Sequence, residues 1–94
     1  MLYLVYAESL HYCDYGQHWV VEASNELGAE DLANECIEEY FYEQDSDQLV
    51  EEGYDLDGMV YAQIVSVEEF GPKHECWKYY QDPKQAQFYI ELNL

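Results

Sequence analysis

Residues 29–43, AEDLANECIEEYFYE, carry the clearest secondary-structure signal in this chain. Their apolar side chains recur at the i, i+3 and i+4 spacing of one face of an α-helix. Ser24 or Asn25 is suited to cap the start of this helix, and Glu26 suits the positive end of its dipole. The stretch predicts one amphipathic helix whose apolar face, which includes Cys36, packs on a core.

The segments around this helix have the composition of β-strands. Residues 2–9 (LYLVYAES) are rich in aromatic and aliphatic side chains, and residues 18–23 and 86–92 alternate between apolar and polar types. A third strand is predicted at 59–67, and a short helix at 72–81. The order β-β-α-β-(α)-β predicts a single α+β domain over all 94 residues, with a small antiparallel sheet of about four strands and the main helix on one face.

The charge of the chain is unusually one-sided. Residues 1–72 contain 18 of the 21 acidic side chains and no Lys or Arg, whereas the remaining 22 residues balance three Lys against three acids. The chain contains no Arg at all. Because self-repulsion on this scale opposes a compact state, such a field favours a strongly positive partner, and many positive protein surfaces exist to hold nucleic acid. The same field argues against direct binding of nucleic acid by this chain.

A helical wheel places Asp31, Glu35, Glu38 and Glu39 opposite the apolar face, with Tyr42 among them. The i, i+4 series from Asp31 to Glu43 spaces four carboxylates about 6 Å apart, and residues 44–58 continue the charge as a predicted acidic connection. Tyr54 is expected to add exposed aromatic contact area beside them. The candidate partner-binding residues are therefore Glu30, Asp31, Glu35, Glu38, Glu39, Tyr42, Glu43, Asp45, Asp47, Glu51, Glu52, Tyr54, Asp55 and Asp57.

Other interpretations of these patterns stay open. The acidic face is also compatible with a solvated coat that confers solubility, or with the acidic surface of a halophilic protein. His11-x-Cys13 and His74-x-Cys76 offer the ligand types of a tetrahedral zinc site, although their spacing is not the usual one. The chain contains no complete calcium loop and no nucleotide-binding or hydrolase motif. We therefore expect no enzymatic activity, no cofactor and no dedicated metal site.

The cellular setting follows from what the sequence contains. Three Cys at wide spacing favour a reducing compartment over a disulfide framework. The N-terminal stretch lacks the basic start and the long apolar run of a signal peptide, and no segment is long and apolar enough to span a membrane. These features predict a soluble cytoplasmic protein.

The carboxylates from Glu26 to Asp57, together with the small size and the absence of Arg, carry a resemblance to small acidic inhibitors encoded by bacteriophages. These inhibitors include DNA-mimicking anti-restriction and anti-CRISPR proteins. The likeness lies in charge, size and layout over about a third of the chain, and it implies a cytoplasmic inhibitor in a bacterial host cell. Its partner would be a basic CRISPR effector or restriction nuclease. An immunity protein against a basic nuclease toxin and an acidic chaperone of a basic protein are the alternatives.

Overall fold

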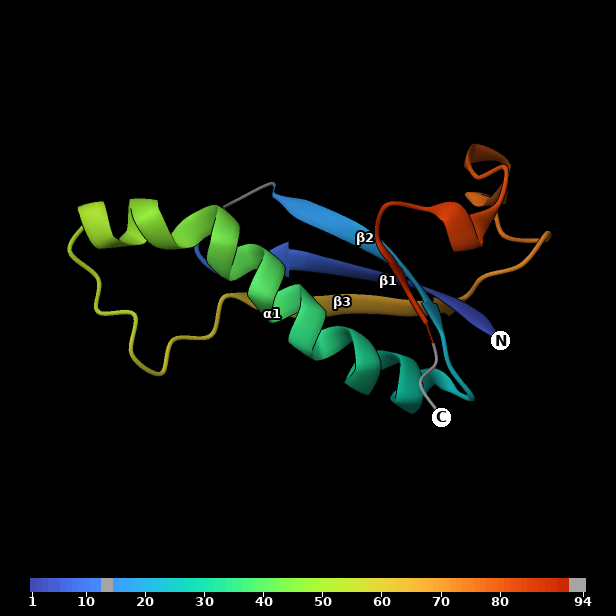
Figure 1. Ribbon diagram of the computed structural model, residues 1–94, viewed down its shortest axis with the longest axis horizontal. Helices are drawn as coiled ribbons and strands as arrows, with labels where there is room; N and C mark the ends of the chain where they lie inside the picture. Colours follow the sequence, from blue (N-terminus) through green and yellow to red (C-terminus); the bar gives the residue numbers. More distant parts are fainter. Residues whose placement is uncertain (13–14, 92–94) are drawn as a thin grey trace.

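The computed structural model describes residues 1–12 and 15–91, which form a sheet crossed by one long helix. The elements are β1 (Leu2–Ser9), β2 (Gly16–Glu22), α1 (Glu26–Glu51), β3 (Ala62–Glu69), the 3-10 turns η1 (Trp77–Tyr79) and η2 (Pro83–Gln85), and β4 (Tyr89–Ile90). The strand order across the sheet is β3-β1-β2-β4, and α1 lies diagonally over one face (Figure 1). The predicted α+β class and element order are confirmed.

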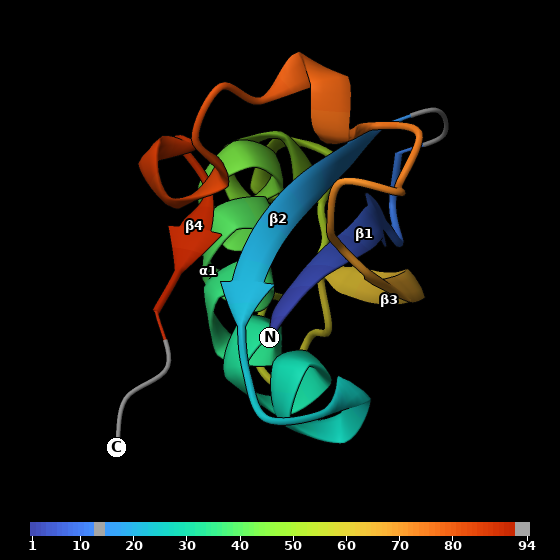
Figure 2. The same cartoon turned by 90° about the vertical axis from the view of Figure 1, so that its right-hand side faces the viewer.

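The sheet differs from the prediction at its last strand. β1 pairs antiparallel with both β2 and β3, as expected, but β4 pairs in parallel with β2 over two residues only. The helix predicted over 72–81 is reduced to the single turn η1. The parallel pairing has a topological cause: after β3 the chain crosses the face of the sheet opposite α1 (Figure 2). It therefore returns towards the end of the sheet at which β2 begins. It then runs along the free edge of β2 in the same direction as β2.

The main core lies between the sheet and α1. Alternating residues of the first two strands, including Val5, Trp19 and Val21, point towards the helix and pack around Ile37 and Phe41. The predicted alternation of residues 18–23 is confirmed, since Trp19 and Val21 belong to this core while Val20 faces the other way. Burying each large apolar side chain is worth about 1.5–3 kcal/mol, so this layer supplies most of the stability of the fold.

A second, smaller core covers the opposite face of the sheet. Leu4, Val20 and Phe70 are buried there under Trp77 and Tyr80, and the Phe70 ring centroid lies 5.1 Å from that of Trp77. Figure 2 shows the segment after β3 (orange) and α1 on opposite sides of the sheet. The charge-balanced C-terminal part of the chain thus closes the sheet on the side away from the acidic helix.

The helix is longer than the sequence pattern indicated. Asn25 caps its start by accepting a hydrogen bond of 2.8 Å from the Gly28 N–H. At its end Gly53 adopts φ +93°, its N–H donates to the Val50 carbonyl, and the Tyr54 N–H donates to the Leu49 carbonyl. This pair of bonds is a Schellman motif, in which a glycine tolerates the left-handed conformation at no steric cost. Glu43 therefore lies in mid-helix and not at the predicted helix end.

The buried face of α1 winds around the helix axis. Six of its seven buried residues recur at every fourth position, namely Ala29, Ala33, Ile37, Phe41, Asp45 and Leu49, and the seventh is Ser46. Each such step turns about 40° beyond a full circle, which lets the contact stripe follow the twist of the sheet beneath it. The prediction that Cys36 packs in the core is wrong, because the thiol lies outside this rotating stripe and is exposed. A wheel averaged over a straight helix cannot represent that rotation.

Candidate functional site

Six exposed carboxylates line the outward face of α1 and form what we term the acidic ridge: Asp31, Glu35, Glu39, Glu43, Asp47 and Glu51. They recur at every fourth position, two residues out of step with the buried file. Two residues correspond to about 200°, so the acidic ridge lies opposite the core along the whole helix. Its five steps of about 6 Å span roughly 30 Å. The sequence predicted the first four members, and the longer helix adds Asp47 and Glu51.

The charge continues past both ends of the acidic ridge. Glu26 and Glu30 are exposed in the first turns of α1, and Glu52, Asp55 and Asp57 are exposed after its end. Figure 1 shows the last turns of α1 and the following loop projecting beyond the ends of the strands. This projection gives the molecule its long axis, with extents of 45 × 28 × 20 Å. The acidic surface is therefore a protruding edge rather than the wall of a cleft.

Two exposed tyrosines lie at this end of the molecule. Tyr42 is 48% exposed and Tyr54 is 54% exposed, as the sequence predicted. The Tyr42 ring packs edge-on against the buried Tyr61, with centroids 5.4 Å apart. Tyr42 is thus held in place by the core while much of its surface faces solvent.

Asp45 does not belong to this surface, which corrects the sequence prediction. Its side chain is only 4% exposed, and its Oδ2 accepts a hydrogen bond of 2.8 Å from the Ser9 hydroxyl. The same Ser9 oxygen accepts bonds from the backbone N–H groups of His11 and Tyr12. Asp45 therefore anchors the chain after β1 to the helix, and in this structure it is inaccessible to a partner.

Glu38 also has a role within the fold. Its two carboxylate oxygens accept bonds from the backbone N–H groups of Tyr61 (2.9 Å) and Ala62 (3.3 Å) at the start of β3. The side chain is half-buried, so the prediction that Glu38 shares the exposed face with Asp31 and Glu39 is wrong. A carboxylate that accepts two backbone N–H groups costs free energy to remove.

The acidic ridge has no internal neutralisation. Among residues 1–12 and 15–91 the ion pairs are Lys84–Glu22 (Nζ to Oε2, 3.7 Å) and His74–Glu68 (Nε2 to Oε2, 2.9 Å), and neither involves α1. Like charges at i, i+4 cost about 0.2–0.5 kcal/mol per pair, so five such steps cost roughly 1–2.5 kcal/mol. Because the spacing is shorter than the Debye length of about 8 Å in physiological salt, these charges repel one another appreciably.

The exposed Cys36 thiol lies in the negative field of the acidic ridge. Partial burial raises its pKa, and the neighbouring carboxylates of Glu35 and Glu39 raise it further because they disfavour a thiolate. A nucleophilic cysteine needs the opposite environment, with a nearby cation or imidazolium. Cys36 therefore has the surroundings of an unreactive thiol.

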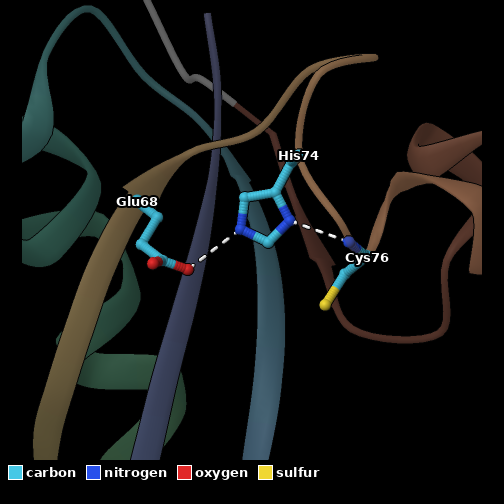
Figure 3. A network of polar contacts seen from close by, with 3 residues as sticks. All are labelled: Glu68, His74 and Cys76. Atoms are coloured by element: carbon cyan, nitrogen blue, oxygen red, sulfur yellow. Dashed lines mark hydrogen bonds and ion pairs between the residues drawn. The ribbon is translucent and has the colours of Figure 1, made fainter.

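The other polar cluster lies on the far side of the sheet and joins Glu68, His74 and Cys76 (Figure 3). The backbone N–H of Cys76 donates to His74 Nδ1 at 3.0 Å, so in the neutral ring the proton resides on Nε2, which donates to Glu68 Oε2 at 2.9 Å. The imidazole thus contacts the backbone of Cys76 and not its sulfur. This arrangement is a structural brace for the turn after β3.

The zinc alternative finds no support in the described part of the chain. His11 Nε2 lies 2.9 Å from the Val60 carbonyl oxygen, near the end of β1, whereas His74 lies beside the opposite end of that strand. Cys13 lies outside the described residues. Within residues 1–12 and 15–91 no three metal-ligating side chains come together.

Comparison with known proteins adds no relative to this picture: no family model, no curated protein sequence and no solved structure matches the chain. In the described residues, no helix is both long enough and apolar enough to cross a membrane.

Proposed function

We propose that this protein is a non-enzymatic inhibitor that occupies the nucleic-acid-binding surface of a basic protein and thereby excludes the nucleic acid. The observation that carries the proposal is the acidic ridge: six exposed carboxylates spaced four residues apart on one helix, with no Lys or Arg in the first 72 residues. A solvated coat needs no such alignment, and it would tolerate intervening Lys or Arg.

The spacing of the acidic ridge supports mimicry of a phosphate backbone. Neighbouring ridge carboxylates lie about 6 Å apart along the helix axis, and two nucleotide steps along one DNA strand advance about 6.8 Å. The axial mismatch accumulates to roughly 4 Å over the five steps, and each step also turns about 40° around the helix axis. The match therefore holds best between neighbouring carboxylates, where flexible side chains absorb the difference. Lys and Arg groups that normally hold phosphates would donate charge-assisted hydrogen bonds to the carboxylates.

The two contributions to binding would differ in their response to salt. The field of the acidic ridge would accelerate encounter with a positive groove, and salt would weaken that effect. Tyr42 and Tyr54 would contribute rigid aromatic contact area that salt affects less. We propose a bacterial CRISPR effector or restriction nuclease as the target class, since such enzymes hold nucleic acid in cationic grooves.

An immunity protein for a basic nuclease toxin and an acidic chaperone would use the same charge chemistry. They differ from a mimic in one respect: a mimic and the target's nucleic acid compete for one surface. Duplex DNA or guide RNA must therefore displace the protein from its target if the proposal is correct.

The decisive experiment compares two triple variants in a pull-down from bacterial lysate at low and high salt. Glu35→Gln, Glu39→Gln and Glu43→Gln neutralise the centre of the acidic ridge, whereas Glu69→Gln, Glu75→Gln and Glu91→Gln remove the same charge from exposed positions elsewhere. We expect the ridge variant to lose a basic nucleic-acid-binding protein that the control and the wild type retain. Equal loss in both variants, or retention by both, would contradict the proposal.

A further inference from the structure

β3 presents an open edge on the side of the molecule next to α1. Within the described residues β3 pairs with β1 alone. The Phe70 N–H donates to the Leu2 carbonyl at the end of this ladder, and donor direction alternates along an antiparallel pair. The backbone groups of Val67 and Glu69 therefore point away from β1, towards solvent. Unpaired groups of this kind are a template for another strand.

Only the start of this edge is closed. Glu38 accepts the outward N–H of Ala62, and among the described residues no side chain caps the backbone groups of Ile64, Val67 or Glu69 in the same way. Val65, beside them, is 52% exposed. The open part of β3 thus combines free backbone groups with exposed apolar surface.

A groove separates this edge from the flank of α1. It has a volume of about 400 Å³, and Ala62 and Ile64 line its strand side while Glu30, Asn34 and Glu38 line its helix side. The helix residues follow one another at i, i+4, about 6 Å apart, and alternate residues of a strand lie about 6.8 Å apart. Because α1 crosses the sheet diagonally (Figure 1), an added strand would not follow the helix along its length, but side chains from one of its faces would point into the groove beside Glu30, Asn34 and Glu38.

We infer that the open edge of β3 binds an extended basic segment of a partner protein, which pairs with β3 as an additional strand. Its alternate Lys or Arg side chains enter the groove and meet the carboxylates of Glu30 and Glu38. Backbone pairing supplies affinity in this mode of recognition, and the alternating side chains supply specificity. The groove lies on the flank of α1, away from the acidic ridge, so this contact does not depend on mimicry of nucleic acid.

Charge decides which occupant fits. The groove is lined by two carboxylates and no cation, and a second copy of this chain would bring another net charge of −18 to the same edge. Like charges at this density oppose self-pairing. A segment rich in Lys or Arg removes that repulsion and satisfies the free backbone groups at the same time.

The test uses the full-length protein and a short synthetic peptide of alternating Lys and Thr, followed by NMR and fluorescence anisotropy. Two further peptides carry N-methyl groups on alternate residues, so that each blocks one of the two backbone edges. We expect the unmodified peptide to shift the amide signals of Ile64, Val67 and Glu69, and one methylated peptide to lose binding while the other keeps it. Glu30→Gln should weaken binding by about tenfold, whereas the matched change Glu43→Gln on the acidic ridge should leave it near the wild-type value.

Four outcomes would overturn the inference. Equal binding by both methylated peptides would exclude strand addition. Signal changes confined to the acidic ridge, or equal weakening by Glu30→Gln and Glu43→Gln, would indicate attraction by the overall field alone. A dimer in sedimentation experiments whose contacts cover β3 would assign the edge to a second copy.

Discussion

The hydroxyl of Ser9, at the end of β1, donates a 2.8 Å hydrogen bond to the buried Oδ2 of Asp45, which lies about two turns before the end of α1. This contact spans 36 positions of sequence, and it places an acidic residue where the rest of the buried file is apolar. The carboxylates of α1 therefore fall into two classes, those bonded within the fold and those exposed to solvent. Asp45 and Glu38 hold the fold together, while the residues of the acidic ridge face solvent.

Replacement of Asp45 tests this separation. Asp45→Ala leaves the Ser9 hydroxyl without its buried acceptor, so we expect a loss of about 1–3 kcal/mol in the free energy of unfolding. A loss of 1 kcal/mol corresponds to about 4–8 °C in Tm for a domain of this size. Urea denaturation measures the difference. Asp47→Ala, two residues along on the exposed face, is the control and should not lower the stability, because it removes two like-charge i, i+4 pairs that each cost about 0.2–0.5 kcal/mol.

Glu38→Gln should loosen the start of β3. The amide side chain retains one acceptor oxygen and turns a donor towards the second backbone N–H, so either Tyr61 or Ala62 loses its partner. We expect native-state hydrogen exchange at these two amides to accelerate about tenfold or more. Glu39→Gln, its exposed neighbour, should leave their exchange unchanged. Unaltered exchange in Glu38→Gln would show that these bonds do not hold the strand.

The acidic ridge should make the protein more stable in salt. Screening shortens the range of the repulsion between ridge carboxylates, so the urea midpoint of the wild type should rise from low to moderate sodium chloride concentration. The ridge variant carrying Glu35→Gln, Glu39→Gln and Glu43→Gln should already be more stable at low salt, by roughly 1–2 kcal/mol. Its midpoint should then depend less on salt. A midpoint that responds to salt equally in both proteins would contradict this account.

The hydrogen bond between Tyr89 and Glu22 should make the free energy of unfolding depend on pH in both acid and alkali. The Tyr89 hydroxyl donates a 2.6 Å bond to Glu22 Oε2, which lowers the pKa of the Glu22 carboxyl, with help from Lys84. The contribution of Glu22 to stability is therefore complete above its ordinary pKa of 4.5 and is lost as the pH falls through its lower folded value.

The same bond raises the pKa of Tyr89 to about 12. The Tyr89 contribution is complete below the ordinary tyrosine value of 10.0 and is lost as the pH rises towards 12. Carboxyl-detected NMR titration of Tyr89→Phe should show the Glu22 pKa moving back up towards its ordinary value. An unchanged Glu22 titration would place the cause elsewhere.

Helix α1 shows which structural features could be predicted from local sequence patterns in this protein. Periodicity located its centre correctly, and Asn25 was among the predicted caps, because both signals depend on side chains a few residues apart. The prediction ended the helix at Glu43 because residues 44–48 contain no apolar side chain. The glycine at position 53 was the available signal for its true end. The buried contact that carries the helix through this stretch, from Asp45 to Ser9, joins residues far apart in sequence.

Sequence alone determined the element order, the alternation of β2 and the one-sided charge, since these follow from composition and short-range periodicity. Only the tertiary structure decided which carboxylates are free. Four residues of an α-helix turn about 40° beyond a full circle, so the buried stripe of α1 winds around the helix axis, which turns Asp45 inward and leaves Cys36 outside the core. Packing of β3 against the helix commits Glu38 to two backbone amides. The acidic ridge and the open edge of β3 are what remains exposed after those contacts are made.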